Sequence, residues 1–311
     1  MDIKKIGLLG GRGYVGQEIL LLLEQHKQLE VVSIYSSSKA GEPLEPKLEN
    51  SLIYKDLNLK NLILADEDAF ILALPNNESK PYVNFIHQYN PEAILIDISS
   101  DHRFDDDWEY RIPELSGPAH SSRISNPGCY ASAMQFMLAP LMAQLDGPAN
   151  LFGISGYSGA GASPNPRNNK ELLRENIIPY ALVSHLHEQE VKAHSYSNVF
   201  FTPHVGEFFR GIMMTGNFTL LEPMAAKDAI KIFQDFYQDK ELIKVCDTVP
   251  TLHEVTSISE VIIGGFEVDT EANRLTFCCA LDNLLKGAAT QAIQNLNSAF
   301  GWKDNLGIIK S

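Results

Sequence analysis

The sequence predicts an α/β protein with two domains. The first is a parallel sheet covered by helices on both faces, and the second is an α+β domain with a mostly antiparallel sheet. Apolar segments in the first third lack polar alternation and are separated by helix-like stretches, which is typical of parallel strands. After about residue 150 the strand-like segments become longer and the helical interruptions weaker. The 311 residues are enough for two ordinary domains.

The first third alternates predicted strands with predicted helices. Leucines and isoleucines between residues 17 and 25 recur at helical spacing, which predicts the first helix directly after a glycine-rich turn. A second helix is expected over 81–89. The strands are expected at 6–9, 31–35, 70–74 and 93–98.

The second domain is predicted from longer strand-like segments and a closing helix. That helix is expected where apolar residues from Leu284 to Leu296 recur at helical spacing, and we expect it to pack on the first domain. The predicted domains are therefore 1–128 with 284–311, and 129–283. The strands are expected at 151–155, 199–203, 211–220, 261–268 and 274–280.

The composition argues against several classes of protein. A net charge of −14 disfavours a nucleic-acid partner. The chain has no run of about 18 apolar residues and no signal-peptide pattern at its start, which predicts a cytoplasmic protein with no membrane span. The cysteines Cys129, Cys246, Cys278 and Cys279 lack metal-binding spacing, so we expect neither a disulfide framework nor a metal. Cys278 and Cys279 are expected in the core of a strand.

A glycine-rich loop follows the first predicted strand. Glycines at this spacing allow a tight turn and close approach to a pyrophosphate, which then lies on the following helix N-terminus. The alternative is a plain glycine-rich turn, but its position between strand and helix favours dinucleotide binding. The loop residues are Gly11, Arg12, Gly13, Tyr14, Val15 and Gly16.

The end of the second predicted strand bears on the choice of cofactor. NAD-preferring proteins place an acidic residue here for the ribose 2′-hydroxyl. This chain has Ser36, Ser38 and Lys39 instead, which suit a 2′-phosphate and favour NADP over NAD. Arg12 is a second candidate phosphate contact, and the alternative for the serines and lysine is a solvated turn.

Cys129 is the strongest candidate nucleophile. It follows Pro127 and Gly128 and precedes a helix-like run over 131–138. A cysteine at a helix N-terminus faces unpaired N–H groups and the positive end of the helix dipole, and both favour the nucleophilic thiolate. Together with the nucleotide loop, this cysteine indicates a reductase that works through a thioester.

A thiolate reductase also needs a proton donor for the developing oxyanion. His185 and His187 lie in one segment followed by carboxylates, so a glutamate there can fix an imidazole tautomer. If the segment begins a helix, only one of the two faces Cys129, because residues two apart lie on opposite faces. His204 is a third candidate.

A second glycine-rich loop, 156–161, brings backbone N–H groups toward a ligand or simply joins two strands. Several arginines are candidates for an anionic substrate, although most arginines lie on protein surfaces. We favour Arg103 and Arg210 over Arg167 and Arg174.

The segment from Asn126 to Tyr130, Asn-Pro-Gly-Cys-Tyr, resembles the active-site motif of the N-acetyl-gamma-glutamyl-phosphate reductase family. Asn-Leu-Leu-Lys-Gly-Ala-Ala over 283–289 is similarly specific. One departure is that Ala162 and Ser163 follow the second glycine loop where a basic residue is often found. Other matching segments, in the family's order, are 11–16, 72–75, 97–104, 112–115, 155–161, 185–188 and 201–204.

The resemblance implies a Rossmann-like NADP-binding domain and a catalytic domain of the aspartate-semialdehyde dehydrogenase type. It implies Cys129 as nucleophile, His187 or His185 as acid/base, and a homodimer or homotetramer. Asn126 joins Arg103 and Arg210 as a predicted substrate contact. Pro75, Ser158, Gly159 and Asn283 are predicted cofactor contacts.

The implied reaction is the third step of arginine biosynthesis from glutamate, the NADPH-dependent reductive dephosphorylation of N-acetyl-glutamyl phosphate to its semialdehyde. One alternative is the same chemistry on another acyl phosphate, such as aspartyl phosphate or a carrier-linked glutamyl or aminoadipyl phosphate, because a few pocket contacts set specificity. A second alternative is a non-catalytic NADP-binding sensor on the same fold.

Overall fold

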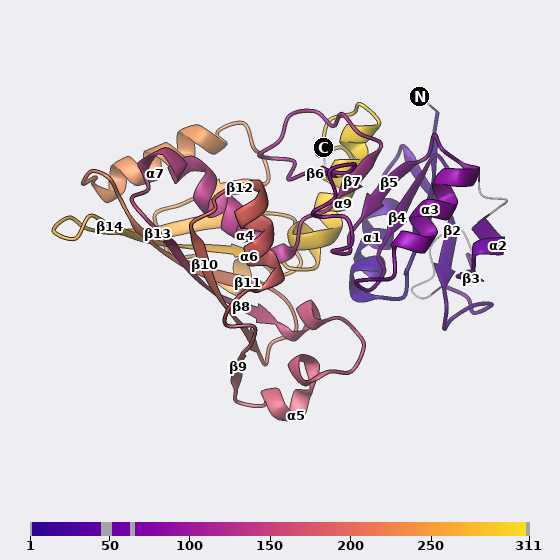
Figure 1. Ribbon diagram of the computed structural model, residues 1–311, viewed down its shortest axis with the longest axis horizontal. Coiled ribbons are helices and arrows are strands. Elements are labelled where there is room, and N and C mark those ends of the chain that lie inside the picture. The colour runs from indigo at the N-terminus through magenta and orange to yellow at the C-terminus, as the bar shows by residue number, and fades with distance from the viewer. Residues whose placement is uncertain (1, 45–51, 63–65, 309–311) are drawn as a thin grey trace. The chain divides into compact units, whose positions relative to one another are not determined.

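The computed structural model describes residues 2–44, 52–62 and 66–308. The chain divides into two compact units (Figure 1). The first unit is Met1–Pro127 with Ala288–Ser311, and the second unit is Gly128–Gly287. Within the described residues, no helix combines the length and apolar character needed to cross a membrane.

The first unit is built on a seven-stranded sheet in the order β3-β2-β1-β4-β5-β7-β6, and every pairing is parallel. The strand order reverses between β1 and β4. In sheets of this kind, a crevice for ligands forms at that switch point, beyond the carboxyl ends of the strands. The strands are β1 Lys4–Leu9, β2 Leu29–Ser36, β3 Tyr54–Asp56, β4 Ala69–Leu72, β5 Ile94–Asp97, β6 Glu109–Tyr110 and β7 Arg123–Ser125.

Helices cover both faces of this sheet. On one face Ile19 of α1 and Ile293 of α9 share a buried core with Ile6 of β1. On the other face Val83 of α3 packs in a core with Phe70 of β4. The predicted parallel sheet, covered on both sides, is confirmed, and the closing helix belongs to this unit. The helices are α1 Tyr14–Glu24, α2 Leu59–Leu62, α3 Lys80–Tyr89 and α9 Thr290–Ala299.

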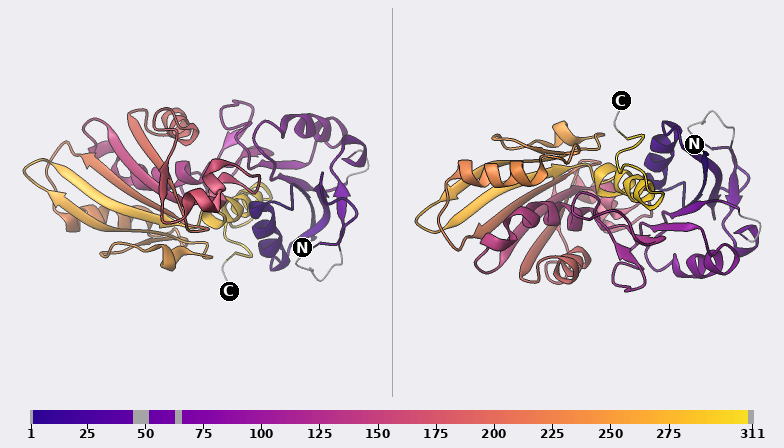
Figure 2. Two further views of the ribbon diagram at one scale, coloured as in Figure 1. Left: turned by 90° about the horizontal axis from the view of Figure 1, so that it is seen from below. Right: turned by 90° about the horizontal axis from the view of Figure 1, so that it is seen from above.

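The second unit holds a seven-stranded sheet in the order β12-β13-β14-β11-β8-β10-β9, visible from two sides in Figure 2. The prediction of a mostly antiparallel sheet was wrong, because the sheet is mixed. Strands β8 and β10 pair in parallel, and so do β12 and β13. Each of these pairs is joined through a helical connection, α6 or α8, that returns the chain to the same end. The strands are β8 Ala149–Gly156, β9 Ile177–Pro179, β10 Val199–Gly206, β11 Ile212–Thr219, β12 Ile243–Val245, β13 Val261–Asp269 and β14 Arg274–Leu281.

One face of the second sheet carries α4, α6 and α7. Tyr130 of α4 lies so close to the sheet that a Cβ added to Gly153 of β8 would meet its ring at 2.6 Å. Phe233 of α7 packs edge-on against Phe277 of β14, with ring centroids 5.0 Å apart. Because alternate residues of a strand face opposite sides, Phe152 of β8 points to the other face, where it is exposed. The helices are α4 Cys129–Leu138, α5 Lys170–Leu173, α6 Leu186–His194, α7 Ala226–Tyr237 and α8 Leu252–Val255.

The two adjacent cysteines of β14 differ in environment. Cys279 is buried, and burial raises the pKa of its thiol. Cys278 is half-exposed on the opposite face, with its sulfur 3.6 Å from the Thr215 hydroxyl oxygen. The expectation of a core position is therefore confirmed for Cys279 and wrong for Cys278, because strand alternation turns Cys278 away from the helices.

Candidate active site

The candidate nucleophile begins a buried helix of the second unit. Cys129 is the first residue of α4, and Gly128 forms the extended N-cap with φ −69° and ψ 150°. The N–H groups in the first turn of a helix have no intrahelical partner, so a thiolate or an oxyanion is stabilised there. A Cβ added to Gly287 would meet the Cys129 Cβ at 2.7 Å. Only a residue without a side chain therefore fits beside the thiol.

Glu190 of α6 anchors this helix start. Its carboxylate is fully buried and accepts a hydrogen bond of 2.9 Å from the Gly128 N–H. Its other oxygen lies 3.9 Å from Nε2 of His187, three residues earlier on α6. A buried carboxylate needs such partners, because an isolated charge in the interior is strongly unfavourable. Sequence reasoning singled out the histidines but assigned Glu190 no contact with Gly128. The sequence signal for Glu190 was its position three residues after His187, which places the two side chains next to each other on a helix.

The two candidate histidines have different roles in the fold. His185 is the N-cap of α6, and its Nδ1 accepts a 3.1 Å hydrogen bond from the His187 backbone N–H. The acceptor role places the ring proton on Nε2. Burial, followed by the nearby His187, lowers the pKa of His185 to about 3, so this ring is neutral near pH 7. His187 is more exposed, and its Nε2 faces the Glu190 carboxylate.

Aromatic rings surround this histidine pair. Tyr130 packs against His185 with ring centroids 6.1 Å apart, and Tyr180 packs against His185 at 5.5 Å. Burial, followed by a charge on the Cys129 thiol, raises the pKa of Tyr180 to about 12. Tyr180, which was not singled out from the sequence, therefore lies within electrostatic reach of the thiol.

His204, the third candidate from the sequence, lies elsewhere. Its ring packs on Phe152, with centroids 4.4 Å apart, on the face of the sheet opposite α4. Its backbone carbonyl accepts a 2.7 Å hydrogen bond from the Tyr130 hydroxyl. His204 therefore supports the helix through its main chain, while its imidazole points away from Cys129.

The predicted cofactor residues of the second unit lie together. The Asn283 side chain donates a 2.9 Å hydrogen bond to the Ser158 hydroxyl and accepts a 2.7 Å bond from the Gly211 N–H. A Cβ added to Gly159 would meet the Ser155 hydroxyl at 2.8 Å and the Asn283 amide nitrogen at 3.7 Å. The second glycine loop therefore packs tightly against Asn283, and the N–H groups of Tyr157 and Ser158 are bonded to the backbone carbonyls of Phe208 and Phe209.

In the first unit the nucleotide loop joins β1 to α1. Gly13 is the extended N-cap of α1, so the helix start has no capping side chain to compete with a phosphate. A Cβ added to Gly16 would meet the Gly10 carbonyl oxygen at 2.6 Å, which explains the need for glycine where helix and strand cross. Gly10, missed from the sequence, has φ +83° and contacts Ala73, two residues before Pro75. This turn fits a dinucleotide pyrophosphate.

The polar residues predicted for the 2′-phosphate lie at the end of β2. The Ser36 hydroxyl accepts a 3.4 Å hydrogen bond from the Ser38 N–H, which forms a tight turn. Lys39 is partly exposed and forms an ion pair with Glu42. A 2′-phosphate therefore competes with the Glu42 carboxylate for this cation. Arg12 is exposed on the nucleotide loop.

The predicted substrate contacts are all held by protein groups. The Arg103 side chain is buried and donates hydrogen bonds to the carbonyls of Asn126, at 3.0 Å, and Ile98, at 2.7 Å. Asn126 is fully buried, and its side-chain oxygen accepts a 3.0 Å bond from Asn295. Arg210 forms a two-pronged ion pair with the buried Asp282, at 2.6 and 3.0 Å. Roles for these three residues in substrate binding stay predictions.

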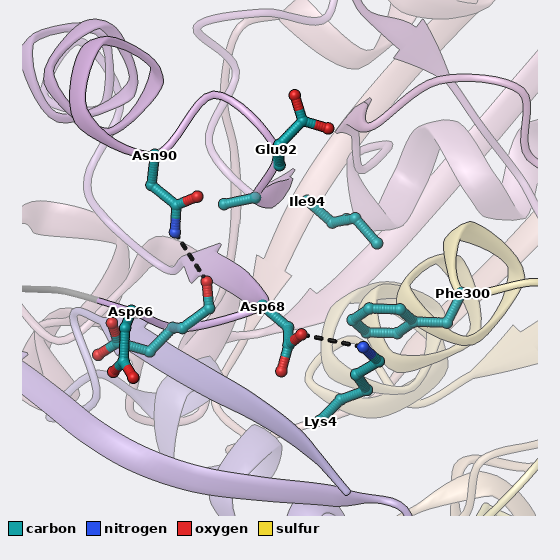
Figure 3. Close-up of a pocket in the computed structure, with 9 residues that line it drawn as sticks. Lys4, Asp66, Asp68, Asn90, Glu92, Ile94 and Phe300 are labelled. Atoms are coloured by element: carbon teal, nitrogen blue, oxygen red, sulfur yellow. Dashed lines mark hydrogen bonds and ion pairs between the residues drawn. The ribbon is translucent and has the colours of Figure 1, made fainter. Parts of the chain in front are cut away.

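A pocket of about 500 Å³ lies in the first unit at the amino ends of β1 and β5 (Figure 3). Its one lining cation, Lys4, pairs with Asp68 at 3.0 Å. Asp66, Glu67 and Glu92 add further carboxylates to its wall. Because the wall is acidic and lies at the sheet edge opposite the nucleotide loop, this pocket does not suit a dinucleotide or an anionic substrate.

A doubly wound nucleotide-type unit, joined to a unit with a thiol at a helix start, defines a protein of the semialdehyde dehydrogenase class. Family models agree: residues 5–123 match the semialdehyde dehydrogenase NAD-binding domain, and residues 129–283 match the semialdehyde dehydrogenase dimerisation domain. The chain is 42% identical to N-acetyl-gamma-glutamyl-phosphate reductase of Xanthomonas axonopodis pv. citri, over 98% of both chains. It is also 42% identical to the Xylella fastidiosa (strain 9a5c) protein of the same name, over 95% of this chain and 90% of the other. The chain belongs to the N-acetyl-gamma-glutamyl-phosphate reductase family.

Solved structures of lower identity share the fold. Aspartate semialdehyde dehydrogenase II from Vibrio cholerae, complexed with ASA, superposes with a TM-score of 0.79 at 17% identity, covering 97% of this chain and 99% of the other. Aspartate semialdehyde dehydrogenase with NADP from Candida albicans gives 0.78 at 17% identity, over 98% of this chain and 100% of that chain. At this identity the likeness concerns the architecture alone.

Proposed function

We propose that this protein reduces N-acetyl-glutamyl phosphate to N-acetyl-glutamate semialdehyde with NADPH, in arginine biosynthesis. The single observation that carries the chemistry is Cys129 at the first position of α4, where its neighbour Gly128 is bonded to the buried Glu190 and its neighbour Tyr130 packs against both histidine rings. The choice of substrate is supported by the names of the relatives that match nearly the whole chain.

The Cys129 thiolate attacks the acyl carbon of the substrate. A carbon–sulfur bond forms, the carbon–oxygen bond to phosphate breaks, and the product is a thioester with free phosphate. N–H groups in the first turn of α4 stabilise the oxyanion that forms during this attack. NADPH, when bound, supplies the hydride that takes the thioester to the oxidation level of the aldehyde. Release of the aldehyde then breaks the carbon–sulfur bond and restores the thiolate.

We assign the acid/base role to His187 rather than His185. His187 faces the buried Glu190 carboxylate at 3.9 Å, and this contact supports a protonated imidazole that gives its proton to the oxyanion. His185 stays neutral because its pKa is lowered to about 3 by burial, and its Nδ1 is held by the His187 N–H. It therefore orients the start of α6.

The nucleotide loop would hold the cofactor pyrophosphate through Gly11, Gly13 and the first turn of α1. The turn after β2, with Lys39 and Ser38, would hold the 2′-phosphate. We also infer a homodimer or homotetramer built through the second unit. The match to a dimerisation domain supports it, and so does the exposure of Phe152 on a helix-free part of the sheet. A cytoplasmic location stays a prediction.

The reverse reaction tests this assignment. With NADP and phosphate, the protein should oxidise N-acetyl-glutamate semialdehyde with a kcat/KM at least about 100-fold above that for aspartate semialdehyde, because the shorter aldehyde lacks the acetyl group and one methylene and so loses their contacts. NADPH formation followed by absorbance measures both rates. A preference for the aspartate compound, or activity with neither, would contradict the proposal. Higher kcat/KM with NAD than with NADP would contradict the cofactor assignment.

A further inference from the structure

Arg167 lies on a rigid turn next to the second glycine loop. The turn Pro166–Asn168 is closed by a capping box, in which the Asn165 side chain accepts a 3.0 Å hydrogen bond from the Arg167 N–H. The Asn168 side chain donates a 2.8 Å bond to the Gly161 carbonyl. The backbone that carries Arg167 is therefore tied to the loop that contains Ser158 and Gly159.

The Arg167 guanidinium stacks on an aromatic ring. Its central carbon lies 4.9 Å from the centroid of the Tyr180 ring. Among residues 2–44, 52–62 and 66–308, no carboxylate lies within ion-pair distance of it. Arg210, in contrast, is paired with a buried aspartate. A stacked guanidinium retains an in-plane edge that matches a carboxylate in a two-pronged contact.

Tyr180 connects Arg167 to the thiol. After burial, a charge on Cys129 is the next influence that raises the pKa of Tyr180, and the Arg167 cation lowers it. The Tyr180 ring also packs on His185, with centroids 5.5 Å apart. The Tyr180 ring therefore contacts both Arg167 and His185, and the charges of Arg167 and Cys129 both act on its hydroxyl.

Of the titratable side chains around the helix start, His185 and Glu190 offer an anionic substrate no positive charge, and the His187 imidazole faces the Glu190 carboxylate. Burial lowers the pKa of His185, so this ring is neutral, and the fully buried Glu190 carboxyl group already accepts the Gly128 N–H. The protein as a whole carries a net charge of −14. The substrate brings a carboxylate about 5 Å from the carbon that Cys129 attacks, given the length of C–C bonds. That carboxylate needs a cation on the same side of the thiol.

We propose that Arg167 binds the carboxylate of the acyl-phosphate substrate and so helps to set substrate specificity. This inference rests on the proposed function and names the residue that recognises the end of the substrate away from the reacting carbon.

Steady-state kinetics of the phosphorylating oxidation test the role directly, since the aldehyde carries the carboxylate and phosphate is a separate substrate. Arg167→Leu should raise KM for N-acetyl-glutamate semialdehyde about 30-fold and leave KM for phosphate within about twofold, while Arg167→Lys recovers part of the loss. Arg174→Leu, an exposed arginine on the same segment, is the matched control and should match the wild type. A rise in KM for phosphate instead, or no change in either constant, overturns the proposal.

Labelling of Cys129 gives a second readout that needs no turnover. The Cys129 thiolate displaces bromide from 5-bromopentanoate and, in a parallel experiment, from the neutral amide of that acid. In 5-bromopentanoate the carboxylate is as far from the reacting carbon as the carboxylate of the substrate is. The ratio of the two labelling rates should fall about tenfold in Arg167→Leu and stay unchanged in Arg174→Leu. An unchanged ratio in Arg167→Leu overturns the inference. If the wild type oxidises no semialdehyde, the proposed function fails, and this ratio still decides whether Arg167 recognises a carboxylate near Cys129.

Discussion

Two helices of this protein begin in nearly the same way and serve different chemistry. The N-cap of α1 is Gly13, with φ −66° and ψ 162°, and the N-cap of α4 is Gly128, with φ −69° and ψ 150°. Neither start has a capping side chain, so the first-turn N–H groups of both suit an anion. A glycine before a helix therefore indicates an anion site but does not specify which anion.

The two helix starts differ in the groups that surround them. The start of α1 is shaped by backbone proximity, because Gly16 lies against the Gly10 carbonyl and the helix is buried on one side only. The helix α4 is buried from Tyr130 to Leu138, and the carboxylate of Glu190 accepts the N–H of its N-cap, Gly128. The first arrangement suits a ligand that binds and leaves, and the second suits a thiol that must be held still during covalent chemistry.

The largest effect is expected at the thiol. Cys129→Ser should lower kcat by at least about 10⁴-fold, because serine is a far weaker nucleophile without an adjacent strong base. Binding of NADPH, measured by fluorescence titration, should be unchanged, since the nucleotide loop is a separate structure. Substantial turnover by this variant would contradict the covalent mechanism. It would also contradict the difference in function that we assign to the two helix starts.

The histidines give the next largest effect. His187→Asn should lower kcat about 10²- to 10³-fold, because it removes the proton donor that faces Glu190. His185→Asn should lower kcat much less, since that ring is neutral and its side chain acts as the cap of α6. Parallel kcat–pH profiles of both variants measure the difference. A larger loss in the His185 variant would reverse our assignment.

The effect of one added methyl group on cofactor binding should depend on its position in the nucleotide loop. In Gly16→Ala the new Cβ meets the Gly10 carbonyl oxygen at 2.6 Å, so KM for NADPH should rise about tenfold. Gly13→Ala is the matched control, because its Cβ meets nothing closer than 3.6 Å, and KM should change by no more than about twofold. Equal effects at both positions would show that backbone freedom, rather than close packing, makes glycine necessary here.

The smallest effect is a pH dependence of stability from His185. Its pKa is about 3 in the folded protein and the ordinary 6.5 when unfolded, so the unfolded state binds more protons between these values. This group therefore lowers stability as pH falls from about 6.5 toward 3, by up to about 1.4 kcal/mol per pH unit. His185→Asn should flatten the dependence of the unfolding free energy on pH in that window. Urea unfolding at several pH values measures it, and an equally steep variant contradicts the prediction.

The strand–turn–helix unit around Gly11 and the parallel sheet of the first unit were predictable from the sequence, because hydrophobic runs and glycine spacing are local signals. The strands of the second unit were also recognisable, yet their pairing was not. Whether β8 meets β10 in parallel depends on the path of the connection through α6. Short elements such as β9 and α5 lack a strong pattern of their own and were missed.

The sequence by itself determined the thiol behind a Pro-Gly turn, the nucleotide loop and the pair of histidines, since each rests on residues that are neighbours along the chain. Only the tertiary structure decided which groups surround the thiol. Glu190 reaches Gly128 from 62 residues away, and Arg167 stacks on Tyr180 across the turn between α5 and β9. Such contacts depend on how helices pack on the sheet, and burial there sets which histidine is neutral. Local periodicity carries no information on that packing.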